Sequence, residues 1–224
     1  MACPRHPSAA SHHQYCPACL LQQALAPADA VGAISMEALQ IQVPLGGSPS
    51  ASVFLARREG RDPRLLRLKI WHAPAPPDFL DRFQDLQARL AAWPQAAIPA
   101  PLAARVDAAG CPSVVSEFRQ GTPILDRVRS GGLDATAALA SLRAITDVIL
   151  AAHGRGLVHG SVVAGNVLVG RGSTSLFLVD FGLAPLLAGL EDHGSTAADD
   201  VAGFDVLNRA LQDLSETIGP PAGP

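Results

Sequence analysis

The stretch from Leu157 to Gly182 constrains the fold of this chain more than any other segment. It contains two short apolar runs of β type, Val167–Val169 and Leu176–Val179, each with a polar residue beside it. Asn166 precedes the first run, and Asp180 follows the second. Carboxylate and amide oxygens are the ligands that hard cations such as magnesium prefer. The segment therefore predicts two strands that bring Asn166 and Asp180 together as magnesium ligands.

Composition favours a folded protein and excludes several classes. The chain has 224 residues, of which 48% are hydrophobic and 17% charged, enough for one domain of about 150 residues plus a small addition. Its net charge of −3 and its 4% aromatic residues argue against nucleic acid and anionic membranes as partners. We find no apolar leader after Met1 and no run of about 18 uncharged apolar residues. We therefore expect a cytoplasmic protein with reduced thiols.

Patterning divides the chain into five expected parts. Apolar residues spaced by four and three predict a helix over 78–93, and Asp134 is a suitable N-cap for a second helix that ends near His153, with Gly154 following it. Further β-type runs are Ser52–Ala56, Leu65–Trp71 and Val114–Phe118. The expected parts are a cysteine- and histidine-rich segment (1–25), a linker (26–38), a mixed part (39–118), a mostly helical part (119–214) and a flexible tail (215–224).

Lys69 is the only lysine of the chain. It stands inside an apolar β-type run, where an ammonium group without a partner would be costly to bury. The position therefore predicts a binding role for Lys69.

Together these motifs resemble the bacterial serine/threonine protein-kinase-like family over about residues 40–214. The loop from His159 to Asn166 resembles the family's catalytic loop, and Asp180-Phe181-Gly182 resembles its metal-binding segment. The resemblance implies an α+β, two-lobed protein-kinase-like fold with an N-lobe over 39–118 and a truncated helical C-lobe over 119–214. It also implies an ATP site with magnesium, formed by Gly46, Gly47, Lys69, Glu117, Phe118, Asn166 and Asp180.

Departures from the family pattern are as informative as the matches. Ser161 stands where the family has the aspartate that accepts the proton of the attacking hydroxyl, and Val163 replaces the loop lysine. Loss of such a base typically costs about 10²–10⁴ in rate. The helix over 78–93 has Leu86 at the position of the ion-pair glutamate. The resemblance therefore implies a pseudokinase, a regulatory scaffold for an unidentified protein partner, with weak ATP binding. A divergent active serine/threonine kinase and a decayed fragment are the alternatives.

The first 25 residues contain two pairs of metal-ligand type, and the segment resembles a zinc ribbon or knuckle. Cys3 with His6, and Cys16 with Cys19, have the spacing that lets two side chains converge on one tetrahedral zinc. His12 and His13 compete as ligands, and a disordered segment with incidental cysteines is the alternative.

We expect about one zinc per chain by elemental analysis of protein purified without chelator. So short a segment has little core of its own, and a structural metal would supply its folding energy. The double substitution Cys16→Ser/Cys19→Ser should remove the zinc. Absence of zinc from the unsubstituted chain would contradict the assignment.

Three further features have simpler interpretations. Arginines crowd the connection between two β-type runs at positions 57, 58, 61, 64 and 67. A solvated basic loop is the default for them, and docking of an acidic partner is the alternative. His159 is expected to be a packed structural histidine, and Cys111 a lone thiol in a turn.

Overall fold

The computed structural model describes residues 30–32, 36, 39–58, 64–171, 175–187 and 196–218. These residues form α-helices and antiparallel sheets, which confirms the α+β class. They divide into two compact units. Unit 1 contains the described residues up to Ala92 together with Ala100–Phe118, and unit 2 contains Trp93–Pro99 and the described residues from Arg119 onward.

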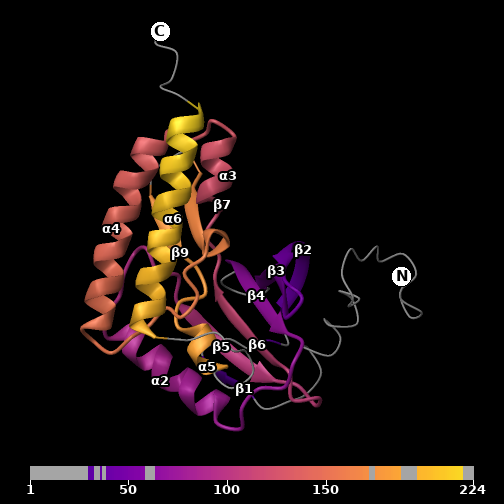
Figure 1. Cartoon of the computed structure of the whole chain (residues 1–224). Helices are drawn as coiled ribbons and strands as arrows, with labels where there is room; N and C mark the ends of the chain where they lie inside the picture. The colour runs from indigo at the N-terminus through magenta and orange to yellow at the C-terminus, as the bar shows by residue number, and fades with distance from the viewer. Residues whose placement is uncertain are drawn as a thin grey trace. The chain divides into compact units, whose positions relative to one another are not determined.

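Unit 1 is built on an antiparallel sheet (Figure 1), whose described strands have the order β1-β5-β6-β4-β3-β2. In chain order the strands are β1 (Ala30–Gly32), β2 (Leu39–Gly47), β3 (Ala51–Arg58), β4 (Arg64–Trp71), β5 (Pro101–Val106) and β6 (Pro112–Glu117). One helix, α2 (Phe79–Ala91), contacts β5 and β1. The β-type runs predicted within β3, β4 and β6 are confirmed.

The core of unit 1 follows from alternation along the central strands. Leu66, Leu68 and Ile70 of β4 are buried on one face. Phe54 and Ala56 of the neighbouring strand β3 pair with Leu68 and Leu66 and belong to the same buried cluster. Helix α2 buries the stripe predicted from its spacing, and Arg89 in its last turn suits the helix dipole.

Strands β1, β2 and β5 were not among the predicted β-type runs. Strand β1 lies inside the segment interpreted as a linker, where Met36 is also buried in the core cluster. Strand β5 has the sequence Pro-Leu-Ala-Ala-Arg-Val, which carries little β-propensity. Strands β1 and β5 form because they pair with their neighbours: β5 is hydrogen-bonded to β1 on one side and to β6 on the other.

Unit 2 combines three longer helices with a small antiparallel sheet of order β7-β8-β9. Helices α4 and α6 lie side by side in it (Figure 1). Its elements are β7 (Gly121–Pro123), α3 (Ile124–Arg129), α4 (Ala135–His153), the 3₁₀ turn η2 (Ala164–Asn166), β8 (Val167–Gly170), β9 (Leu176–Leu178), α5 (Leu183–Leu186) and α6 (Ala197–Ile218).

Helix α4 begins and ends near the predicted positions. The Asp134 side chain accepts hydrogen bonds from the amides of Thr136 (2.9 Å) and Ala137 (3.1 Å), which confirms it as the N-cap. Gly154 is the C-cap of the helix and has right-handed backbone angles, with φ −59°. The glycine with a positive φ is Gly156, two residues further on.

Among the described residues, α4 is long and apolar enough to cross a membrane by length and composition alone. No spanning segment was expected from the sequence. Six residues of α4 are buried in unit 2, and the helix packs against α6 and β9. A core helix meets the same criterion, so length and composition do not make α4 a membrane span.

Candidate functional site

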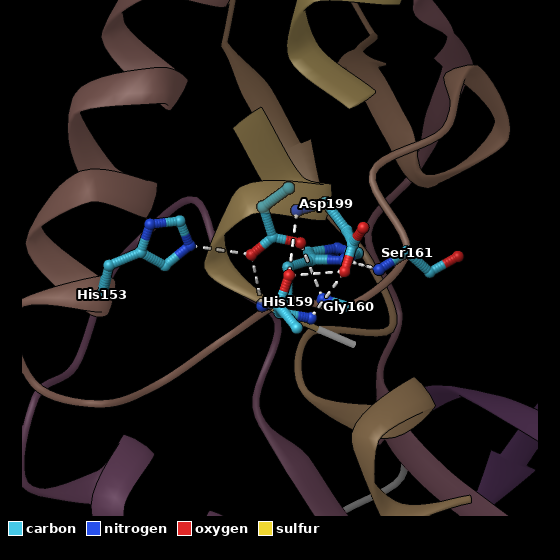
Figure 2. Close-up of polar contacts among 7 residues, drawn as sticks. His153, His159, Gly160, Ser161 and Asp199 are labelled. Atoms are coloured by element: carbon cyan, nitrogen blue, oxygen red, sulfur yellow. Dashed lines mark hydrogen bonds and ion pairs between the residues drawn. The ribbon is translucent and has the colours of Figure 1, made fainter. Parts of the chain in front are cut away.

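The centre of unit 2 is a loop held by the buried carboxylate of Asp200, in the first turn of α6. Figure 2 shows His159, Gly160 and Ser161 of this loop, with His153 beside them. Asp200 is 1% exposed. Its Oδ1 accepts the amide of Gly160 at 2.8 Å, and its Oδ2 accepts the amide of His159 at 2.8 Å. His153 Nε2, at the end of α4, lies 2.9 Å from the same Oδ2. One carboxylate therefore joins two helices to the start of the loop.

His159 is fully buried and structural, as the sequence predicted. Its Nδ1 accepts the amide of Ser161 at 3.1 Å, so its Nε2 donates to the carbonyl of Val179, also at 3.1 Å. Its ring meets that of Phe181 edge to face, with centroids 5.4 Å apart. Because both ring nitrogens bind backbone groups, His159 positions the loop against the Asp180 segment.

The structure brings Asn166, Asp180 and Ser161 into one part of unit 2. Strands β8 and β9 pair, and the Val179 amide donates to the Asn166 carbonyl at 3.0 Å. Asn166 Nδ2 donates to the Ser161 carbonyl at 2.9 Å and contacts its Oγ at 3.4 Å. Asp180 has φ 64°, the one positive φ found on a non-glycine residue in the described parts. Aspartate tolerates this conformation better than most residues, and such strain is typical of functional positions.

No group on this loop can act as a strong base. The stretch from His159 to Gly165 contains no carboxylate, and Ser161 occupies the position of the expected base. Asp200 lies nearby, but both of its oxygens accept hydrogen bonds from the loop. The loop therefore orients polar groups, but it offers no carboxylate of its own to remove a proton.

Lys69 lies in unit 1, on β4, between Val53 of β3 and Val114 of β6. Its Nζ lies 4.8 Å from the centroid of the Trp71 ring, a cation–π contact along the same strand. Arg67 stands two residues before it, and therefore on the same face of the sheet. This face of unit 1 therefore carries two cations.

The turn between β2 and β3, which follows Gly46 and Gly47, is closed by its own hydrogen bonds. The Ser48 amide donates to the Ala51 carbonyl at 2.7 Å, and the Ala51 amide donates back to Ser48. The His72 ring bridges the Pro49 carbonyl at 2.9 Å and the Ser52 hydroxyl at 3.0 Å. Two of the turn's amides are therefore already engaged within the turn.

The remaining residues of the predicted site also lie in unit 1. Glu117 Oε2 accepts the Ala100 amide at 3.4 Å, and Phe118 is the last residue of the unit. Leu86 is buried in α2, and its neighbour Asp85 pairs with Arg89 of the same helix at 3.5 Å. Neither residue supplies the carboxylate that a kinase-like α2 would direct at Lys69.

The predicted zinc ligands Cys3, His6, Cys16 and Cys19 lie outside the described residues. Within the part that is described, no three His, Cys, Asp or Glu side chains form a group that could hold a metal ion. Cys111 is a free thiol whose pKa is raised by burial and by the neighbouring charge of Asp107. A raised pKa keeps the thiol protonated near neutral pH. The free thiol agrees with the prediction of a lone cysteine.

Comparisons with known proteins give a distant and partial match. No protein-family model matches the chain. The chain is 27% identical over 123 residues to a protein of the archaeon Methanoculleus marisnigri named "Probable bifunctional tRNA threonylcarbamoyladenosine biosynthesis protein". The match spans 51% of this chain but only 23% of the archaeal protein.

This match corrects the family expected from the sequence. The assignment to a bacterial serine/threonine protein-kinase-like family is wrong, because the matching protein is named for tRNA threonylcarbamoyladenosine biosynthesis. The structure does contain the local elements that suggested the assignment, namely strands β8 and β9 and the turn at Asp180. They do not establish that family.

Proposed function

We propose that this chain is an ATP-binding regulatory component that acts in tRNA threonylcarbamoyladenosine biosynthesis and does not itself transfer phosphate. The pathway comes from the name of the archaeal relative. The absence of transfer is inferred from the loop at the centre of unit 2. A regulatory role leaves the chemistry to another protein and uses this chain for binding.

The proposal rests on one observation: the loop from His159 is held in place by buried hydrogen bonds, yet it contains no carboxylate that could act as a base. The loop is held by buried hydrogen bonds that involve Asp200, His153 and His159. Such an ordered loop argues against a decayed fragment. Within unit 2, Asn166 and Asp180 supply oxygen atoms suited to the Mg²⁺ that accompanies ATP. The nucleotide would bind through that Mg²⁺, and Ser161 would leave it unreacted.

A thermal-shift titration with ATP and magnesium tests the binding. We expect the midpoint to rise with ATP concentration, because a ligand at 100 times its Kd stabilises the folded state by about 2.7 kcal/mol. Asp180→Ala should lose most of the shift. Asp205→Ala, which removes an exposed carboxylate of α6 outside the loop, should keep it. No shift in the unsubstituted chain, or equal shifts in both variants, would remove ATP from the proposal.

The role in tRNA modification is tested separately. In a strain that lacks the gene, mass spectrometry of digested tRNA should show less threonylcarbamoyladenosine, and the unsubstituted gene should restore it. The purified chain should hydrolyse ATP no faster than its Asp180→Ala variant. An unchanged level of the modified nucleoside would refute the pathway, and turnover that depends on Asp180 would refute the regulatory assignment.

A further inference from the structure

A cavity of about 290 Å³ lies in unit 2 beside β7, the end of β8 and α3. Its polar lining consists of Gln120, Thr122, Arg127 and Arg171, with Val169 and two glycines completing the wall. None of these residues takes part in the loop around Asp200 or in the proposed ATP site. The cavity is therefore a separate feature of the unit.

The charge of the lining is positive and uncompensated. Neither Arg127 nor Arg171 has an ion-pair or hydrogen-bond partner for its side chain among the described residues, and no carboxylate lines the cavity. Arg129, two residues along the same helix, instead pairs with Asp126 at 3.2 Å. Two guanidinium groups that share one cavity repel each other unless an anion lies between them.

The fold holds both arginines at the cavity. Strand pairing sets Gly121 of β7 opposite Gly170 of β8, and both glycines line the cavity. Arg171 is the next residue after Gly170. The Arg127 guanidinium lies against the turn after α3, where a Cβ on Gly132 would come within 2.5 Å of Arg127 Cζ. The Gly132 amide also donates to the Arg127 carbonyl at 3.0 Å. The absence of a Cβ at Gly132 therefore leaves room for the guanidinium in this position.

We propose that this cavity binds a phosphate group, carried either by a small phosphate ester or by an RNA backbone. Two guanidinium groups match the paired oxygens of phosphate, which carries two negative charges in a small monoester and one in an RNA backbone. The Thr122 hydroxyl and the Gln120 amide add neutral donors, so the lining offers more donors than the two oxygens of a carboxylate require. The proposal does not depend on ATP binding at Asp180.

Calorimetric titration of the full chain with inorganic phosphate tests the site. Arg127→Gln and Arg171→Gln should each weaken binding about tenfold, since each removes a charged hydrogen-bonding group. Arg129→Gln removes the same charge from the same helix outside the cavity and should change the affinity less than about twofold. Gly132→Ala keeps every charge but displaces Arg127, and it should also weaken binding.

Titration with an unmodified tRNA transcript, with and without excess phosphate, distinguishes the two sources. Competition between tRNA and phosphate, lost in the Arg127→Gln/Arg171→Gln variant, would support an RNA backbone. Phosphate binding without tRNA binding would support a small ester. No phosphate binding by the unsubstituted chain, equal binding by the double variant, or binding of a glutamate-rich peptide that phosphate fails to displace would overturn the proposal. Unchanged ATP shifts in the double variant would confirm that the two sites are independent.

Discussion

Replacing Asp200 by alanine is expected to lower the free energy of unfolding by about 3–5 kcal/mol, because the change strands several buried polar groups at once. The amides of His159 and Gly160 would lose their acceptor, and His153 would lose its partner. Alanine offers no replacement, and a side chain 1% exposed leaves little access for water. Urea unfolding followed by circular dichroism measures the change.

The neighbouring residue provides a matched control. Asp199 is exposed and forms a capping box with Thr196, whose amide and hydroxyl donate to Asp199 Oδ2 at 2.9 and 2.6 Å. These hydrogen bonds lower the pKa of the Asp199 carboxyl. Its contribution to stability is therefore present above the ordinary carboxyl pKa and is lost as the pH falls through the lowered value. Asp199→Ala should destabilise far less than Asp200→Ala, and equal losses would show that Asp200 does not anchor the loop.

The local elements of the fold were largely predictable from the sequence. The stripe of α2 and the capping aspartate of α4 act within one or two helical turns, so the sequence shows them directly. The same applies to β8 and β9, because Asn166 and Asp180 flank two apolar runs that could only be short strands. The backbone hydrogen bond from Val179 to Asn166 follows from that pairing.

Contacts between distant residues were not predictable. His153 and Asp200 stand 47 positions apart, and neither lies in a motif that names the other. Nothing in the sequence predicts that His153 shares this carboxylate. Strand β5 was not predicted for the same reason. Its alanine-rich segment has little β-propensity, and it forms a strand because β1 and β6 pair with it. The phosphate cavity likewise depends on the pairing of β7 with β8.

The error in family has a physical origin. Asp180 follows a short apolar strand, and Gly182, two residues later, has a positive φ. This short turn places a carboxylate at the end of a strand and needs no particular overall fold. Proteins with different roles can share such a turn, because function depends on the whole site and its surroundings.

Replacing Gly160 by alanine should destabilise unit 2 by about 2–5 kcal/mol, the sum of two independent costs. Gly160 has φ 80°, a conformation that costs an L-residue about 1–2 kcal/mol. A Cβ there would also lie 2.5 Å from Pro185 Cδ and 2.9 Å from its Cγ. Proline is rigid, so α5 would have to move, and α5 directly follows the Asp180 turn.

The displacement should reach the candidate site as well as the stability. The Gly182 amide donates to the His159 carbonyl at 3.2 Å, so a shift of α5 pulls on the loop that Asp200 holds. Gly154→Ala is the matched control: this glycine has φ −59°, and its nearest neighbour to a new Cβ lies at 3.7 Å. Alanine there should be neutral or stabilising by up to about 1 kcal/mol, because it reduces the entropy of the unfolded chain. Opposite signs for the two substitutions in urea unfolding would establish that Gly160 is required by position, whereas similar small effects would show that α5 yields freely.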